Sequence, residues 1–88
     1  MTKLGLLNDR VRAVLLKDWD PIGIADVPQA QDEYDAYVPQ VARLVAGGRS
    51  TVELSEYLLH LETDVLGLLG DRERARAVAG KLAEIEWA

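Results

Sequence analysis

The chain has 88 residues, of which 49% are hydrophobic and 28% charged, and it contains no cysteine. This length supports one globular core and is too short for a second domain or for a pocket that encloses a large cofactor. The lack of cysteine excludes disulfides, thiolate zinc sites and cysteine nucleophiles. No run of about 18 apolar residues occurs, and the N-terminus lacks the apolar core of a signal peptide, so we expect a cytoplasmic protein without a membrane segment.

The net charge of −5 is distributed unevenly along the chain. Residues 1–17 carry four bases and one acid, a net charge of +3, and residues 72–88 carry four bases and three acids, a net charge of +1. Residues 18–71 carry eleven acids and two bases, a net charge of −9. An acidic middle repels phosphate backbones, so the pattern disfavours nucleic acid and favours a basic protein partner.

Apolar residues three and four positions apart predict a first helix over about residues 6–18. The dipeptide Asp20-Pro21 should end this helix, because the residue before a proline is pushed out of the α region. The following connector contains Gly23 and Pro28 and no helical period. We expect it to lie against the bundle through three apolar anchors, which are Ile22, Ile24 and Val27.

A second helix is predicted to begin near residues 29–32, where acids suit the positive end of the helix dipole. Its apolar stripe runs from Tyr34 to Val45. Pro39 lies inside this stripe and permits two interpretations. Either the helix is bent and loses the hydrogen bond to the carbonyl of Asp35, or it breaks near residue 38 and restarts at Pro39.

The third and fourth helices have the clearest start signals. Ser50 and Glu53 match a capping box, and Asp71 is placed to cap the last helix. The expected core positions are Leu54, Tyr57, Leu58, Leu61, Val65 or Leu66, Ala75, Val78, Ala79, Leu82 and Ile85. The pattern therefore predicts an all-α, single-domain bundle of about four helices over residues 1–88, in an up-and-down arrangement.

Motifs for metal binding or catalysis are missing. The sequence DEYD at residues 32–35 lacks the alternating oxygen ligands and the glycine turn of a calcium loop. His60 lies between Glu56 and Asp64, which are about 12 Å apart along a helix and cannot share one ion with it. Phosphate loops, nucleophile elbows and metalloprotease motifs do not occur. We predict no catalytic residue, no metal site and no cofactor, and a hydrolase using Asp32, Asp35 or His60 is the weakest alternative.

Residues 18–42, which we call the acidic segment, contain six carboxylates and three aromatic residues, and they contain no Lys or Arg. The carboxylates are Asp18, Asp20, Asp26, Asp32, Glu33 and Asp35. We predict a partner-binding surface made of Trp19, Asp20, Asp32, Glu33, Tyr34, Asp35 and Tyr37. For the three aromatic rings, packing in the core is the open alternative to contact with a partner.

A second stripe of the last helix faces away from its predicted core. It consists of Gly80, Ala83 and Trp87. Small residues permit a close approach of helices and Trp87 is large and apolar, so the stripe favours a homodimer. The alternative is a frayed C-terminus with a loosely packed Trp87.

Two resemblances bear on function. The run 19-WDP-21 followed by 32-DEYD-35 resembles a family of small uncharacterised bacterial helical domains, which implies a helical fold and no catalytic residues. The order of Asp32, Tyr34, Tyr37 and Pro39 is also similar in character to the acidic, tyrosine-bearing surface of colicin-type immunity proteins. Those short four-helix domains block basic nucleases. The resemblance implies an acidic module that docks on a basic protein, in its most specific form an immunity protein that neutralises a toxin, and the alternative is a self-associating structural domain.

Overall fold

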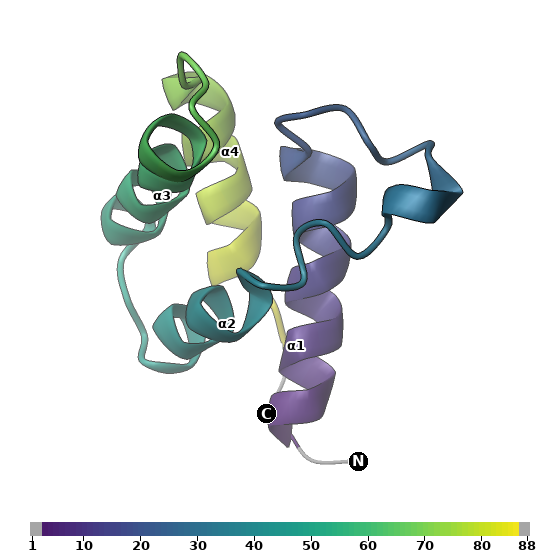
Figure 1. Cartoon of the computed structure of the whole chain (residues 1–88). Coiled ribbons are helices and arrows are strands. Elements are labelled where there is room, and N and C mark those ends of the chain that lie inside the picture. Colours follow the sequence, from purple (N-terminus) through teal and green to yellow (C-terminus); the bar gives the residue numbers. More distant parts are fainter. Residues whose placement is uncertain (1–2, 87–88) are drawn as a thin grey trace.

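Four α-helices surround one hydrophobic core in the computed structural model, which describes residues 3–86 and only the backbone of residues 3 and 4 (Figure 1). The helices are α1 (Lys3–Val14), α2 (Val38–Ala46), α3 (Thr51–His60) and α4 (Arg72–Ala83). One π-helical turn extends α1 (Leu15–Trp19), another extends α3 (Leu61–Val65), and a 3₁₀ turn covers Pro28–Ala30. Residues 3–86 contain no strand, so the all-α prediction is confirmed.

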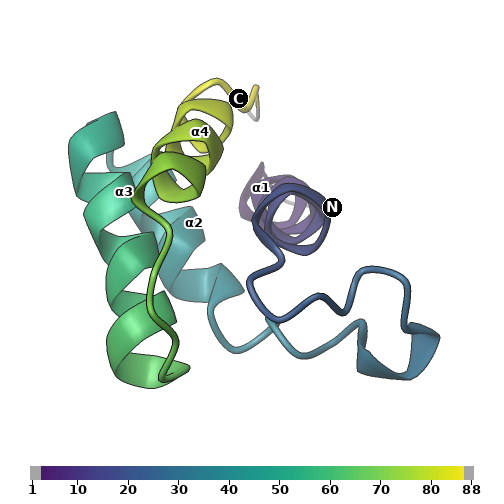
Figure 2. The same cartoon turned by 90° about the horizontal axis from the view of Figure 1, so that it is seen from above.

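The arrangement of the helices differs from a simple up-and-down bundle. In both views α1 and α4 run side by side, whereas α3 crosses them steeply (Figures 1 and 2). Gly67 and Gly70 have φ angles of 70° and 86°, and they turn the chain back along α3 before α4 begins. The two glycines follow the π-helical end of the third helix, and they set this crossing. Within residues 3–86 no helix is long and apolar enough to cross a membrane.

The predicted starts of α3 and α4 are confirmed by their caps. Ser50 Oγ accepts a hydrogen bond from the Glu53 amide at 3.2 Å. Asp71 Oδ1 accepts one from the Arg74 amide at 3.0 Å. Each cap satisfies a backbone donor that has no partner inside its own helix, and thus fixes the first turn.

The predicted start of the second helix is wrong. Residues 31–37 form consecutive turns, and α2 begins only at Val38. Pro39 then lies in the first turn of the helix, where the N–H that proline lacks would have no helical partner. The restart at Pro39 is therefore correct and the bent helix is not, because a proline is compatible with a helix start and breaks a helix interior.

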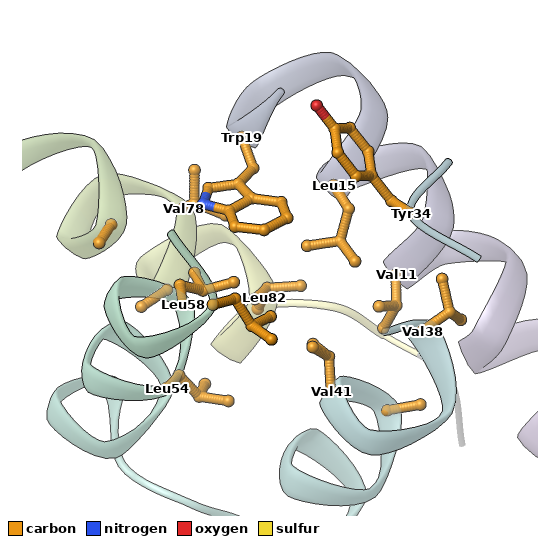
Figure 3. Packing of buried hydrophobic residues seen from close by; sticks show 14 of the residues in the cluster. Val11, Leu15, Trp19, Tyr34, Val38, Val41, Leu54, Leu58, Val78 and Leu82 are labelled. Atoms are coloured by element: carbon orange, nitrogen blue, oxygen red, sulfur yellow. The ribbon is translucent and has the colours of Figure 1, made fainter. Parts of the chain in front are cut away.

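The core follows the predicted helical stripes (Figure 3). Its fully buried members include Leu7, Val11, Leu15, Leu54, Leu58, Val78, Ala79 and Leu82. Leu66 packs against the core and Val65 is exposed, which decides between these two residues. Of the three expected anchors in the connector, only Ile24 packs against the core. Ile22 and Val27 are 42% and 41% exposed, because the connector turns outward and is held by hydrogen bonds rather than by burial.

Candidate interaction surface

Residues 20–31, which we call the projecting loop, leave the end of α1 and extend away from α3 and α4 (Figures 1 and 2). The chain then returns through the turns at residues 31–37 to the start of α2. Most of the acidic segment therefore lies on a surface excursion and the turns that follow it. The hydrogen bonds within this excursion determine which of its side chains are exposed.

Asp20 organises the first half of the projecting loop. Its Oδ1 accepts hydrogen bonds from the Ile24 amide at 2.8 Å and from the Tyr34 hydroxyl at 2.8 Å, and its Oδ2 accepts one from the Ala25 amide at 3.0 Å. The Tyr34 hydroxyl in turn accepts a hydrogen bond from the Ile22 amide at 3.3 Å. Asp20 has a positive φ of 29°, which is uncommon for a residue other than glycine. These bonds to its carboxylate offset the strain of that backbone conformation.

Gln31 closes the second half of the projecting loop. Its amide nitrogen Nε2 donates to the carbonyl oxygens of Ile24, Ala25 and Val27 at 3.2, 3.0 and 3.0 Å. Arg12 of α1 holds the far end, since its Nη2 donates to the Gln31 carbonyl at 3.0 Å. A loop that is cross-linked in this way loses little conformational entropy when a partner binds it.

The charges of this region shift the pKa values of three groups. Burial raises the pKa of Asp20, but the hydrogen bonds from Ile24, Tyr34 and Ala25 outweigh it and lower the pKa below its ordinary value. Burial raises the pKa of Tyr34, and the neighbouring Asp20 carboxylate raises it further. The hydrogen bond and charge of Asp35 raise the pKa of Arg12. All three groups therefore keep their ordinary charge state at neutral pH.

Trp19 and Tyr34 lie in the core, 1% and 2% exposed, with ring centroids 5.3 Å apart. Tyr37 is half-buried and meets the Trp19 ring edge-on at a centroid distance of 6.4 Å. The core alternative is therefore correct for Trp19 and Tyr34, whose rings a partner cannot reach in this conformation. Both residues have structural contacts instead: Tyr34 donates a hydrogen bond to the Asp20 carboxylate, and Trp19 donates one to Glu62.

The carboxylates of the acidic segment divide into two groups. Asp18 pairs with Lys81 at 2.8 Å, Asp35 pairs with Arg12 Nε at 2.6 Å, and Asp20 is used within the loop. The other group is exposed, and its side chains make no hydrogen bond or ion pair with any residue in the range 3–86; it consists of Asp26, Asp32 and Glu33. Of the acids predicted for the surface, only Asp32 and Glu33 are therefore unpaired within that range, and Asp26, which was not among them, joins this group. Ile22 and Val27 are exposed on the projecting loop that carries Asp26.

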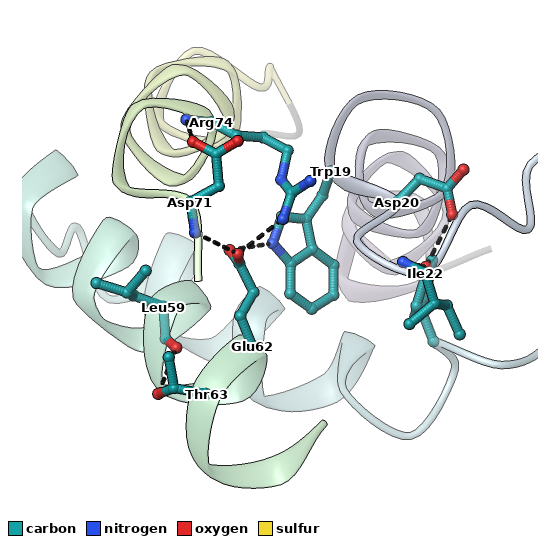
Figure 4. A network of polar contacts seen from close by, with 9 residues as sticks. Trp19, Asp20, Ile22, Leu59, Glu62, Thr63, Asp71 and Arg74 are labelled. Carbon is teal, nitrogen blue, oxygen red and sulfur yellow. Dashed lines mark hydrogen bonds and ion pairs between the residues drawn. The ribbon is translucent and has the colours of Figure 1, made fainter. Parts of the chain in front are cut away.

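A buried carboxylate that sequence reasoning missed joins the end of α1 to the junction of α3 and α4 (Figure 4). Glu62 is 0% exposed. Its Oε2 accepts a hydrogen bond from Trp19 Nε1 at 2.9 Å, and its Oε1 accepts from the Asp71 amide at 2.9 Å and from Arg74 Nη2 at 2.7 Å. Three donors, one of them charged, compensate for the burial of this charge. In the sequence Glu62 lies in the polar stretch Glu62-Thr63-Asp64 between Leu61 and Val65, and no local signal marks it as buried.

The remaining predicted residues do not converge on a site. His60 Nδ1 and Asp64 Oδ2 are 2.8 Å apart on an exposed face. In the described range no three acidic or histidine side chains are arranged to hold a metal ion. Gly80 is half-buried and Ala83 is exposed, whereas Trp87 lies outside the described residues, so the self-association stripe stays a prediction.

Comparison with known proteins gives no relative from which a function can be carried over. No protein-family model, no curated protein and no solved structure matches this chain. The functional argument therefore uses the chain's own residues. The arrangement contains an acidic surface excursion, cross-linked by the hydrogen bonds of Asp20 and Gln31, and a helical body.

Proposed function

We propose that this protein is a small acidic interaction module that docks on a basic protein partner through its projecting loop and the turns that follow. The observation that carries the proposal is the division of the carboxylates. Asp18, Asp20 and Asp35 are held by partners within the chain, whereas Asp26, Asp32 and Glu33 are exposed and unpaired in the described range. Three unpaired acids on the projecting loop and the turns that follow it attract a basic surface and speed the encounter with it.

Exposed apolar side chains add the affinity that surface charges lack. Ile22 and Val27 are both about two-fifths exposed on the same loop, at 42% and 41%. Burying such groups in an interface is favourable by roughly 25 cal/mol per Å² of apolar surface. The hydrogen bonds of Asp20 and Gln31 hold the loop in one shape before binding, so little of this gain is lost to ordering.

The partner that fits this surface is a protein with a cluster of Lys and Arg side chains. A toxin that binds nucleic acid has such a surface, and the likeness in character to immunity proteins supports this particular form of the proposal. Gene neighbourhood is the cheapest check, because an immunity gene normally lies beside the gene of its toxin. The alternative, self-association through Gly80, Ala83 and Trp87, predicts a homodimer and needs no neighbouring toxin gene.

The direct test is capture of the partner from the source cell followed by binding kinetics. Asp32→Asn combined with Glu33→Gln should slow association, and the effect should shrink when the salt concentration rises well above about 0.1 M, where charges are screened beyond about 10 Å. The matched control is Glu84→Gln combined with Glu86→Gln, which removes two exposed charges near the other end of the bundle. An acidic partner, or equal slowing by both double variants, would contradict the proposal.

The apolar part of the surface has its own test. Ile22→Ala and Val27→Ala should mainly speed dissociation of the captured partner, because contacts made after encounter determine the off-rate. Leu6→Ala is the control, since it shortens an exposed apolar side chain on α1. Unchanged dissociation for both loop variants would show that the partner does not cover the projecting loop.

A further inference from the structure

The groove between α3 and α4 has chemistry opposite to that of the projecting loop. Its volume is about 260 Å³, below the roughly 300 to 1,000 Å³ of sites that enclose drug-sized ligands, so it fits one or two side chains of a partner. It is lined by Thr51, Val52, Ser55, Glu56, Arg72 and Arg76. The groove shares no residue with the projecting loop or with the buried Glu62 contacts.

Two arginines give the groove its positive side. Arg72 and Arg76 are exposed, and within residues 3–86 neither makes a hydrogen bond or an ion pair with its side chain. They are four residues apart on α4, about 40° apart around the helix, so both guanidinium groups lie along one edge of the groove. Paired guanidinium groups are well suited to bind a carboxylate through charged hydrogen bonds.

Contacts on the opposite side of α4 fix which way Arg72 and Arg76 face. Arg74 lies about 200° around α4 from Arg72, and it is tied to the buried Glu62 at 2.7 Å. Asp71 caps the helix one residue before Arg72. These two contacts hold the rotation of α4, and they keep Arg72 and Arg76 turned toward the groove.

The α3 side of the groove supplies an apolar contact and one opposing charge. Val52 is 63% exposed, so most of its side chain is accessible to a partner. Glu56 lines the same groove and makes no hydrogen bond or ion pair in the described range. It leaves the groove with a net charge of +1, so a ligand with a single carboxylate fits better than one with several.

We propose that the groove between α3 and α4 binds a short segment of a partner protein that carries one acidic side chain next to an apolar one. The carboxylate lies between Arg72 and Arg76, and the apolar side chain covers Val52. The argument for this occupant is charge complementarity with the two unpaired arginines, combined with the exposed valine beside them. The protein then has two recognition surfaces of opposite charge, one for a basic partner and one for an acidic segment.

The probe for this proposal is an acetylated pentapeptide amide of sequence Gly-Leu-Glu-Leu-Gly, titrated into isotopically labelled protein and followed by NMR. We expect shifts concentrated at residues 51–56 and 72–76, and weaker binding when Gln or Lys replaces the central Glu. Arg72→Gln combined with Arg76→Gln should weaken binding about tenfold or more. Arg10→Gln combined with Lys17→Gln removes the same charge from exposed positions of α1 and of the π-helical turn that extends it, and should leave binding unchanged.

Glu56→Gln provides a test that loss of folding cannot imitate, because it should tighten binding by about two- to fivefold. Three results would overturn the proposal: no localised shifts at millimolar peptide, equal binding of the Gln peptide, or weaker binding by Glu56→Gln. Inorganic phosphate that shifts the same residues more strongly and displaces the peptide would overturn it too, since the groove would then be a general oxyanion site.

Discussion

Two carboxylates, Asp20 and Glu62, organise two regions of this protein in different ways. Asp20 is half-buried, and its hydrogen-bond partners lie within 14 positions of it in the sequence. Glu62 is fully buried. Two of its partners, Asp71 and Arg74, are 9 and 12 positions away, but the third, Trp19, is 43 positions away. The same acceptor chemistry thus shapes one surface loop in the first region, and joins α1, α3 and α4 in the second.

Asp20 therefore shapes a surface loop, whereas Glu62 supports the helical body. Loss of the Asp20 contacts should loosen the projecting loop, because among the described residues the amides of Ile24 and Ala25 donate to this carboxylate alone. Loss of Glu62 should affect the whole fold, because Arg74 and Trp19 would then be left with buried, unpaired donors.

Glu62→Ala should lower the free energy of unfolding by about 3 to 5 kcal/mol, the usual cost of removing one partner of a buried ion pair. For a domain of this size each kcal/mol corresponds to roughly 4 to 8 °C in melting temperature. Thermal melts measure the change. Glu84→Ala removes an exposed acid and should stay within about 0.5 kcal/mol of the parent. If the two variants melt together, Glu62 does not hold the three helices.

Gly70→Ala should destabilise the protein by about 3 kcal/mol, because it adds overpacking to an unfavourable backbone conformation. A Cβ at Gly70 would lie 2.9 Å from Thr63 Cγ2 and 3.1 Å from Leu59 Cδ1, at a φ of 86°. Gly67→Ala is the matched control, since its φ is 70° but no atom lies within 4 Å of the added Cβ. Denaturant unfolding should show a clearly smaller loss for Gly67→Ala, and equal losses would mean that the chain before Asp71 is not tightly packed.

Asp20→Asn should cost about 1.5 to 3 kcal/mol at neutral pH, the range for hydrogen bonds to a charged group. The pKa of Asp20 is lowered in the folded state, so its contribution is complete above the unfolded-state pKa of about 4 and is lost as the pH falls through the lower folded-state pKa. The stability gap between parent and variant should therefore be constant above about pH 5 and should close at more acidic pH. A gap that persists unchanged into strong acid would show that charge is not the cause.

Ser50→Ala should cost roughly 1 kcal/mol, because the serine side chain satisfies one backbone donor at the start of α3. Ser55→Ala is a suitable control, since Ser55 lies inside α3 and its hydroxyl donates only to the nearby Val52 carbonyl. Melting temperatures of the two variants measure the difference. Coincident melts of Ser50→Ala and the parent would mean that the cap contributes nothing to stability.

Sequence patterns predicted the parts of the fold that depend on neighbours in the chain. The caps at Ser50 and Asp71 and the stripe that contains Leu54 and Leu58 are local features, and the structure confirms them. The helix expected from residues 29–32 was wrong, because apolar periodicity was allowed to outweigh the helix-starting preference of Pro39.

The contacts of the candidate site join residues that are far apart in the sequence, and no local pattern encodes such contacts. Asp20 and Asp35 were counted as surface acids, but their partners Tyr34 and Arg12 are 14 and 23 positions away. The exposure of Ile22 and Val27 was also missed, since an apolar residue in a connector looks the same in the sequence whether it anchors the loop or faces solvent. Charge counting located the acidic segment correctly but did not separate paired from unpaired acids.

The first half of the projecting loop owes its order to the Asp20 carboxylate rather than to the packing of the helical body. Amide hydrogen exchange of Asp20→Asn tests this most directly. The account predicts that the Ile24 and Ala25 amides exchange much faster than in the parent, by a larger factor than the amides of Leu58 and Val78 in the core helices. Equal acceleration at all four positions would contradict it, because the loop would then open only when the whole protein unfolds.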